Sequence, residues 1–196
     1  MKVLVACEES QAVTIELRKL GHEAYSCDIL ECSGGHPEWH LQQDVTPLLD
    51  KDWDMIIGFP PCTYLSNAGA RHLYRGGLLN KERYELGLKG KELFMKIYNA
   101  PCPRICVENP TPSKIYGLPE HTQVIQPYYF GHPCTKRTLL WLKGLPKLEY
   151  TNVVKPEQSC RTAGNWFNKG GKDRQRNRAK TFPGIAKAMA EQWGKL

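Results

Sequence analysis

The sequence predicts an α/β fold with a mostly parallel sheet and helices on both faces, and three observations support this prediction. Residues 2–28 have the pattern strand, turn, helix, strand and acid, which is one mononucleotide-binding half of a doubly wound sheet. Apolar runs at 55–57 and 105–107 each end at polar or reactive residues, as buried parallel strands often do. Of the 196 residues, 41% are hydrophobic, which is enough for the core of one domain.

The predicted elements are clearest in residues 2–28. Residues 2–6 have the apolar composition of a buried strand, and Cys-Glu-Glu-Ser at 7–10 forms a turn. Ser10 is a favourable N-cap for a helix over 11–20, whose apolar residues recur at helical spacing. A second strand is predicted over 22–27.

The residues of this unit also indicate the kind of ligand. The turn lacks the glycines of a dinucleotide fingerprint, and its two glutamates would repel a pyrophosphate. Asp28, at the end of the second strand, suits the hydroxyls of a ribose. These features favour S-adenosylmethionine over NAD. The alternative is a plain βαβ unit with Asp28 at the surface.

The rest of the chain continues the alternation of strands and helices. Glycine and proline predict loops at 30–40 and 144–165, and the stretch 63–80 is expected to be a long mobile loop. Further strands are predicted over 41–45, 53–59, 103–107, 122–130 and 137–143, and further helices over 81–99 and 183–193. We expect a single domain over 1–196, in which 144–180 form a small basic irregular insertion before the C-terminal helix.

Four polar or reactive side chains follow predicted strands. They are Asp28, Asp44, Cys62 and Glu108. Parallel strands bring their carboxyl ends to one edge of the sheet, so these residues are expected to share a crevice. Cys62 follows two prolines on a stiff turn, where it is either a nucleophile or a structural loop cysteine. Glu108 is either part of the site or a surface acid.

The charge favours an anionic partner. The formal net charge is +7, and Lys and Arg are concentrated between 169 and 180. Trp166 and Phe167 precede this basic run, so it is either a nucleic-acid contact or a solvated loop. No run of 18 apolar residues occurs and the N-terminus lacks the layout of a signal peptide, so we expect no membrane partner and a cytoplasmic protein in a bacterial host or phage-infected cell.

The eight cysteines are scattered, which predicts reduced thiols rather than a disulfide framework. His36 and His40 are four residues apart, as are Cys102 and Cys106, but these spacings match no common zinc site. We therefore expect no metal.

Taken in order, these motifs resemble the DNA cytosine-5 methyltransferases, in particular short phage and prophage members without a full target-recognition domain. Pro60-Pro61-Cys62 resembles the nucleophile motif, and Glu108-Asn109-Pro110 resembles the Glu-Asn-Val motif. Residues 130–137 are similar to the segment that supplies an arginine, and 181–184 to the last motif, which packs on the cofactor. The resemblance covers most of the chain and implies a Rossmann-like S-adenosylmethionine-dependent methyltransferase fold.

The resemblance also implies roles for individual residues. Cys62 would add to carbon 6 of cytosine, Glu108 would hold ring nitrogen 3, and Arg137 would hold the carbonyl oxygen. The residues implied in binding S-adenosylmethionine are Cys7, Glu8, Glu9, Ser10, Asp28, Ile29, Asp44, Val45, Pro60, Thr181 and Phe182. Those expected to contact DNA are Ser66, Asn67, Arg71, Arg75, Lys169, Lys172, Arg174, Arg176 and Arg178.

The chain departs from the family pattern at three places. The cofactor turn lacks the family's glycines, and Cys134 and Thr135 stand where Gln and Arg are expected. Only 144–180 are available for target recognition. The expected substrate is duplex DNA, and a homodimer would enlarge the recognition surface. The alternatives are the same chemistry on single-stranded nucleic acid or a free cytosine nucleotide, and a non-catalytic nucleic-acid-binding protein. A thiol-based redox or hydrolytic enzyme would need a partnered histidine motif, which the sequence lacks.

Overall fold

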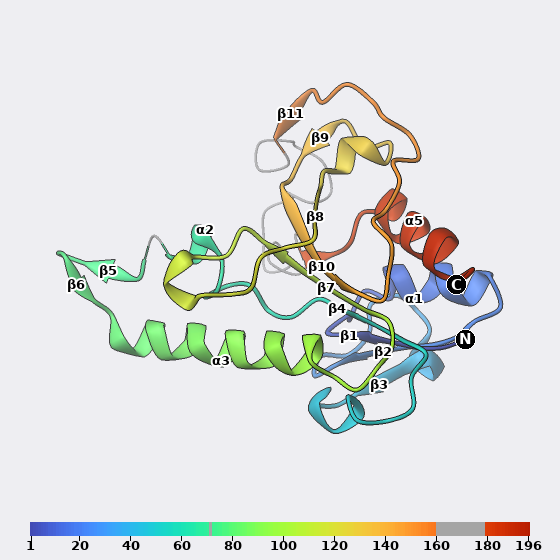
Figure 1. The fold of residues 1–196 in the computed structure, drawn as a ribbon, viewed down its shortest axis with the longest axis horizontal. Helices are drawn as coiled ribbons and strands as arrows, with labels where there is room; N and C mark the ends of the chain where they lie inside the picture. Colours follow the sequence, from blue (N-terminus) through green and yellow to red (C-terminus); the bar gives the residue numbers. More distant parts are fainter. Residues whose placement is uncertain (71, 160–178) are drawn as a thin grey trace.

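The structure, a computed structural model, describes residues 1–70, 72–159 and 179–196. Its main sheet contains β1 (Lys2–Ala6), β2 (Glu23–Asp28), β3 (His40–Gln42), β4 (Met55–Gly58), β7 (Ile105–Pro110), β8 (Gln123–Ile125) and β10 (Thr138–Lys143). The strand order is β3-β2-β1-β4-β7-β10-β8, and only β10 runs antiparallel to its neighbours (Figure 1).

Helices cover both faces of this sheet, which confirms the predicted Rossmann-like fold class. Helix α3 (Lys81–Tyr98) lies on one face, and α1 (Ala12–Lys19) and α5 (Pro183–Trp193) lie on the other (Figure 1). Along β1, Val3 and Val5 pack in the cluster with α1 and α5, whereas Leu4 packs in the cluster with α3. The central strands are therefore buried on both sides, which explains their continuous apolar sequence.

The turn after β1 differs from the expectation that Ser10 caps the first helix. Gln11 occupies the N-cap position with a φ of 57° and makes no side-chain capping bond. Instead the Glu8 carboxylate accepts hydrogen bonds from the backbone N–H groups of Val13 at 2.7 Å and Thr14 at 3.2 Å. A carboxylate at this end is favoured because the first N–H groups of a helix have no partner within it.

Burial raises the pKa of Glu8 from 4.5 to about 7, although its hydrogen bonds favour the charged form. Between these values the folded state holds a proton that the unfolded state has released, so this group makes the protein less stable as pH rises from about 4.5 to 7. Glu8→Gln removes the titration. We therefore expect the difference in free energy of unfolding between Glu8→Gln and wild type to shift in favour of the variant as pH rises across this window, by up to about 1.4 kcal/mol per pH unit.

Denaturant unfolding at several pH values measures this difference. Glu16→Gln is the control because Glu16 lies on the same helix and pairs at the surface with Lys19. Parallel stability curves for wild type and Glu8→Gln would contradict the prediction.

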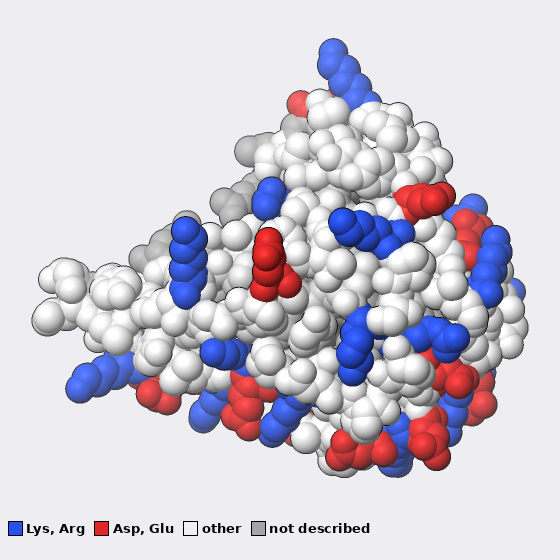
Figure 2. Space-filling view, in the orientation of Figure 1, with Lys and Arg blue, Asp and Glu red and all other residues white. Residues whose placement is uncertain are grey.

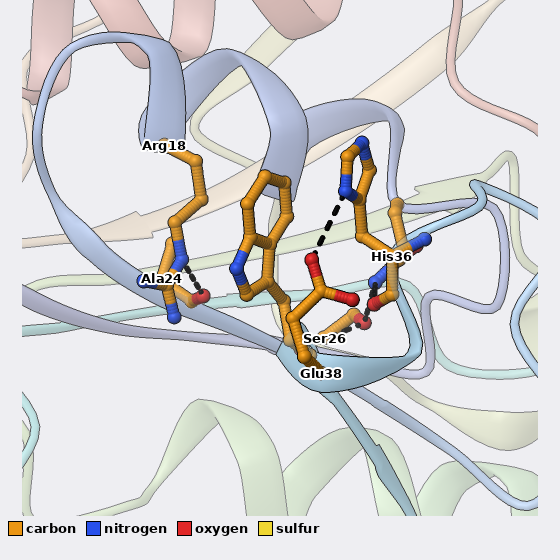
Figure 3. Close-up of polar contacts among 7 residues, drawn as sticks. Arg18, Ala24, Ser26, His36 and Glu38 are labelled. Atoms are coloured by element: carbon orange, nitrogen blue, oxygen red, sulfur yellow. Dashed lines mark hydrogen bonds and ion pairs between the residues drawn. The ribbon is translucent and has the colours of Figure 1, made fainter.

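The loop after β2 is held against α1 by a stack of side chains (Figure 3). The Trp39 ring lies between the Arg18 guanidinium, 5.2 Å from the ring centroid, and the His36 ring, with centroids 3.9 Å apart. His36 also pairs with Glu38. These contacts fix residues 29–39 and so the position at which Asp28 leaves the sheet.

The stretch after Cys62 is more ordered than the predicted long loop. Its described residues contain α2 (Asn67–Ala70) and a hairpin of β5 (Tyr74–Arg75) and β6 (Leu78–Leu79). Gly76 and Gly77 have φ values of 56° and 81°, the left-handed conformation that two-residue hairpin turns require. The expectation of a structureless loop is therefore wrong, because the glycines form a tight turn.

Helix α3 follows at the predicted place. Asn80 caps it by accepting a hydrogen bond from the Arg83 backbone N–H. Gly87, which lowers helix propensity, is buried against Tyr116, and a Cβ added at this position would overlap the Tyr116 ring. Close packing thus explains this glycine.

The C-terminal half follows the predicted order with shorter strands. Within 122–130 only β8 is a strand, because a 3₁₀ turn begins at Pro127. The short strands β9 (Cys134–Thr135) and β11 (Gln158–Ser159) pair in parallel. Cys134 is disulfide-bonded, so the prediction of reduced thiols is wrong there. Within the described residues, no helix is long and apolar enough to span a membrane.

Candidate active site

The Cys62 turn begins where β4 ends. Phe59 donates its backbone N–H to Ala6, which keeps the chain beside β1 for one more residue. Pro60 and Pro61 then end the sheet pairing because they have no N–H to donate. The Cys62 carbonyl accepts a hydrogen bond of 2.9 Å from the Ser66 N–H, which closes the turn.

This turn is tied to the segment that follows Glu108. In the sheet Gly58 pairs with Val107, so Glu108 lies one residue beyond the end of β4. Beyond β7, the Asn67 N–H donates to the Thr111 carbonyl and the Ser113 N–H to the Leu65 carbonyl, both at 2.9 Å. The cysteine turn and the glutamate strand therefore form one hydrogen-bonded unit at the carboxyl edge of the sheet, as predicted for neighbouring parallel strands.

Glu108 faces a small pocket of about 20 Å³ on the α5 side of the sheet. Its lining residues are Phe59, Glu108, Ile125, Lys136, Thr138, Ala179, Thr181, Phe182, Ile185 and Met189. Burial raises the pKa of Glu108 above its usual range, and the positive charge of Lys136 opposes this shift. The volume suits a water molecule, so a nucleobase could enter only if the lining moved.

Among the residues that the structure describes, the cation in the lining of the Glu108 pocket is Lys136, and Arg137 does not line this pocket. Lys136 is half-buried, its ammonium lies 5.8 Å from the centroid of the Phe182 ring, and Arg137 is exposed. Lys136 and Thr138 both line the pocket, which places Arg137 on the opposite side because side chains alternate along an extended chain. The implied role of Arg137 at the substrate stays a prediction.

A larger pocket, of about 340 Å³, opens at the ends of β1, β2 and β3 on the α3 side. It brings together five of the residues expected to bind S-adenosylmethionine, namely Cys7, Asp28, Ile29, Asp44 and Val45. Pro61, adjacent to Cys62 in the chain, lines it too. The volume falls within the range of small-molecule sites.

The charges of this pocket favour a cationic ligand. Asp28, Asp44 and Glu92 contribute three carboxylates, and Lys89 and Lys96 contribute two ammonium groups. Lys96 pairs with Glu92 at 2.9 Å. One negative charge remains in excess when all five groups are ionised, which opposes binding of a pyrophosphate.

Hydrogen bonds hold the two aspartates in place. Asp28 Oδ1 accepts the backbone N–H of Leu30 at 2.9 Å, and Asp44 Oδ1 accepts that of Thr46 at 2.7 Å. The bond from Thr46 lowers the pKa of Asp44. The Thr46 side chain also hydrogen-bonds Asp44, whereas the second carboxylate oxygen of Asp28 suits hydroxyl donors of a ligand.

The other residues expected at the cofactor lie elsewhere. Glu8 and Glu9 are buried, and Glu8 caps α1. Pro60 is buried behind Pro61, and Ser10 is not among the lining residues. Thr181 and Phe182 line the Glu108 pocket instead.

The lining residues of the larger pocket that were not predicted from the sequence come mainly from α3. Lys89, Glu92, Leu93 and Lys96 all face the pocket, at the spacing of one face of a helix. That spacing is visible in the sequence, but only the packing of α3 across the strand ends shows that this face covers the pocket. Cys27, Gln43 and Thr46 complete the lining.

The residues expected to contact DNA separate into two groups. Ser66 is buried and accepts the Gly69 N–H, whereas Asn67 is exposed at the start of α2 and Arg75 lies in β5. Arg71, Lys169, Lys172, Arg174, Arg176 and Arg178 lie outside the described residues.

Most of the net positive charge comes from position 71 and residues 160–178, which lie outside the described residues. Position 71 and residues 160–178 contain seven Lys and Arg and one Asp, a net of +6 out of the total +7. The described residues are therefore nearly neutral, and Figure 2 shows their charges of both signs interspersed on the face in view. Long-range attraction of a polyanion would depend mainly on residues 160–178.

No family model matches the sequence, and no curated protein matches it. Among solved structures, one similar chain is a candidate DNA modification methyltransferase encoded within a prophage of Escherichia coli. The two share 13% sequence identity with a TM-score of 0.45, over 71% of this chain and 45% of that chain. This chain thus matches less than half the length of that protein, and its function has to be inferred from its own residues.

Proposed function

We propose that the protein transfers a methyl group from S-adenosylmethionine to carbon 5 of cytosine in DNA, through a covalent bond to Cys62. One observation carries this proposal. The turn that presents Cys62 is hydrogen-bonded to the segment after Glu108, and its Pro61 lines the pocket that contains Asp28. A nucleophile, an acid and a nucleoside-sized site thus share one edge of the sheet.

The residue types suit each step of this reaction. The Cys62 thiolate would form a bond to carbon 6, and the ring electrons would move to nitrogen 3, where Glu108 supplies a proton. Carbon 5 thereby becomes nucleophilic and accepts the methyl group. Loss of the carbon 5 proton to a base then expels Cys62 as a thiolate, and nitrogen 3 returns its proton to Glu108, which restores the neutral aromatic ring. The raised pKa of Glu108 favours the protonated form that this step uses.

The larger pocket fits S-adenosylmethionine by its chemistry. When bound, this cofactor supplies a methyl group on a positively charged sulfur. Asp28 would hold the ribose hydroxyls, Ile29 and Val45 supply apolar surface for the adenine, and the excess negative charge favours a cation.

We expect Lys136 to matter more than Arg137. Lys136→Met removes the cation beside Glu108 and should lower the methylation rate by about 10²-fold, whereas Arg137→Met should stay within about threefold of wild type. The same change removes a charge that lowers the pKa of Glu108, so the pH at which activity is lost through deprotonation of Glu108 should rise. Rates measured against pH for both variants check this, and a larger loss in Arg137→Met would contradict it.

Label transfer tests the proposed function directly. Protein is incubated with methyl-tritiated S-adenosylmethionine and, separately, mixed-sequence native DNA, the same DNA after heat denaturation, and dCMP. Digestion to nucleosides should place the label in 5-methyldeoxycytidine. Label on an exocyclic nitrogen would contradict the Cys62 mechanism, and no label in any substrate would contradict methylation altogether.

The three substrates also decide among the alternatives. The small size of the Glu108 pocket and the short stretch available for recognition leave single strands and free nucleotides as rival substrates. Label in dCMP alone would identify a nucleotide-modifying enzyme. DNA binding without label in any arm would identify a binding protein on the same fold.

A further inference from the structure

We infer that Tyr128, Tyr129 and Tyr150 form a stacking platform for the unpaired bases of single-stranded DNA. The inference deepens the proposed function, on which it rests for the choice of a nucleic acid as ligand. It starts from an aromatic side chain that solvent reaches although two other rings contact it. Tyr150 is 51% exposed, and its ring lies against those of Tyr129 and Phe130.

The geometry leaves one face of the Tyr150 ring open. The Tyr129 ring stacks on the other face, with centroids 4.0 Å apart and an interplanar angle of 14°. Phe130 meets Tyr150 edge-on, with centroids 6.2 Å apart and an angle of 86°. Every nucleobase has a flat π face, so an open aromatic ring is a stacking site for bases of any sequence.

Hydrogen bonds hold the platform in place before any ligand binds. The Asn152 N–H donates to the Tyr129 carbonyl at 3.2 Å, and the Val154 N–H donates to the Tyr128 carbonyl at 2.9 Å. The Tyr128 hydroxyl donates to the Tyr129 hydroxyl at 3.2 Å. The segment that carries Tyr150 therefore lies along the turn that precedes β9 (Figure 1). Rings that are already ordered lose little conformational entropy on binding.

The root of the platform packs against an element of the candidate active site. Phe130 is buried in the same cluster as Phe182, which lines the Glu108 pocket. The Gly184 N–H, in the first turn of α5, donates to His132 Nε2 at 3.0 Å. The turn that carries two of the tyrosines is thus fastened to the helix that borders this pocket.

The chain also enters and leaves its most basic stretch beside these elements. Ser159 pairs with Thr135 in the ladder of β9 and β11, and Ala179 lines the Glu108 pocket. Between them, residues 160–178 contain six Lys and Arg and one Asp, a net of +5. Sites for single strands combine basic residues for the phosphates with aromatic rings for the bases, and this part of the chain contains both.

The size and chemistry of the platform favour unpaired bases over a protein or a duplex. A stable protein interface buries about 800 Å² on each partner, and even a large aromatic side chain buries only about 150–250 Å². Three tyrosines, two of which are already half-buried, fall short of that area. In a duplex the faces of the bases are hidden in the stack, so an open aromatic ring has little to contact there.

Fluorescence anisotropy with labelled oligothymidylate and with a labelled duplex of mixed sequence tests the platform. Tyr150→Leu keeps an apolar side chain against Tyr129 but removes the aromatic face. It should weaken binding of oligothymidylate by about tenfold and change binding of the duplex by less than about twofold. Tyr150→Phe keeps the ring and should bind both ligands like wild type. Leu20→Ala is the control, because Leu20 is 48% exposed at the end of α1, and it should also match wild type. Thermal unfolding confirms that the variants fold.

The same titrations at low and high salt separate stacking from charge. Binding of every protein should weaken as salt rises, but the factor lost in Tyr150→Leu should stay the same because no charge is removed. Equal losses for both ligands, no loss in Tyr150→Leu, a loss that disappears at high salt, or no binding of oligothymidylate by wild type would overturn the platform. Oligothymidylate contains no cytosine, so these results stand whether or not wild type methylates DNA, which the label-transfer experiment decides separately.

Discussion

Replacing Cys62 with alanine is expected to lower methyl transfer by at least about 10³-fold, because the thiolate that makes carbon 5 nucleophilic is lost. Cys32→Ala is the matched control, since Cys32 is also a half-buried reduced cysteine, and it lies in the loop after β2 rather than in the turn after β4. Its rate should equal that of wild type. Binding of S-adenosylmethionine, measured by calorimetry, should be the same for all three proteins. Activity retained in Cys62→Ala would contradict covalent catalysis.

The same prediction has a structural readout. DNA that contains 5-fluorocytosine cannot lose a proton from carbon 5 after methyl transfer, so the bond between Cys62 and carbon 6 persists. Wild type and Cys32→Ala should form a complex that survives denaturing electrophoresis, and Cys62→Ala should form none. A trapped complex in Cys62→Ala would assign the nucleophile to another cysteine.

Replacing Glu108 with glutamine should produce the second large loss, of about 10²–10⁴-fold, because an amide cannot supply a proton to ring nitrogen 3. Folding should tolerate the change, since burial already disfavours the charged carboxylate. Glu120→Gln, at an exposed position, is the control and should keep the wild-type rate. Unchanged activity in Glu108→Gln would exclude Glu108 as the acid.

Wild type and Glu108→Gln should also differ in how their rates change with pH. Burial raises the pKa of Glu108, and the proposed reaction uses its protonated form. The wild-type rate should therefore fall as pH rises through that pKa, and the residual rate of Glu108→Gln should lack this fall. If both proteins show the same decline at high pH, another group causes it.

Local patterns were sufficient to predict the sheet and the edge at which the candidate site lies. The apolar runs at 55–57 and 105–107 became β4 and β7, and the residues after them, Cys62 and Glu108, lie at the same edge. The reason is physical: a buried parallel strand needs a continuous apolar run, and its end is marked where that run stops. The same rule predicted that Asp28 and Asp44 lie at this edge, and both line the larger pocket.

Side-chain direction could not be predicted in the same way. Lys136 rather than Arg137 lines the Glu108 pocket because β10 begins at Thr138, and a shift of one residue along an extended chain reverses the face. Likewise Glu8 lies inside the fold, where it caps α1, because the left-handed residues Cys7 and Gln11 turn the chain before the helix starts. These are properties of backbone placement, which depends on distant contacts.

By itself, the sequence determined the fold class, the order of the strands along the chain and the identity of the residues at their carboxyl ends, because these follow from local apolar periodicity. Only the tertiary structure decided that α3 covers the larger pocket, that Lys136 lines the pocket of Glu108, and that residues 74–79 form a hairpin. Those features depend on contacts between segments far apart in the chain, which no local pattern encodes.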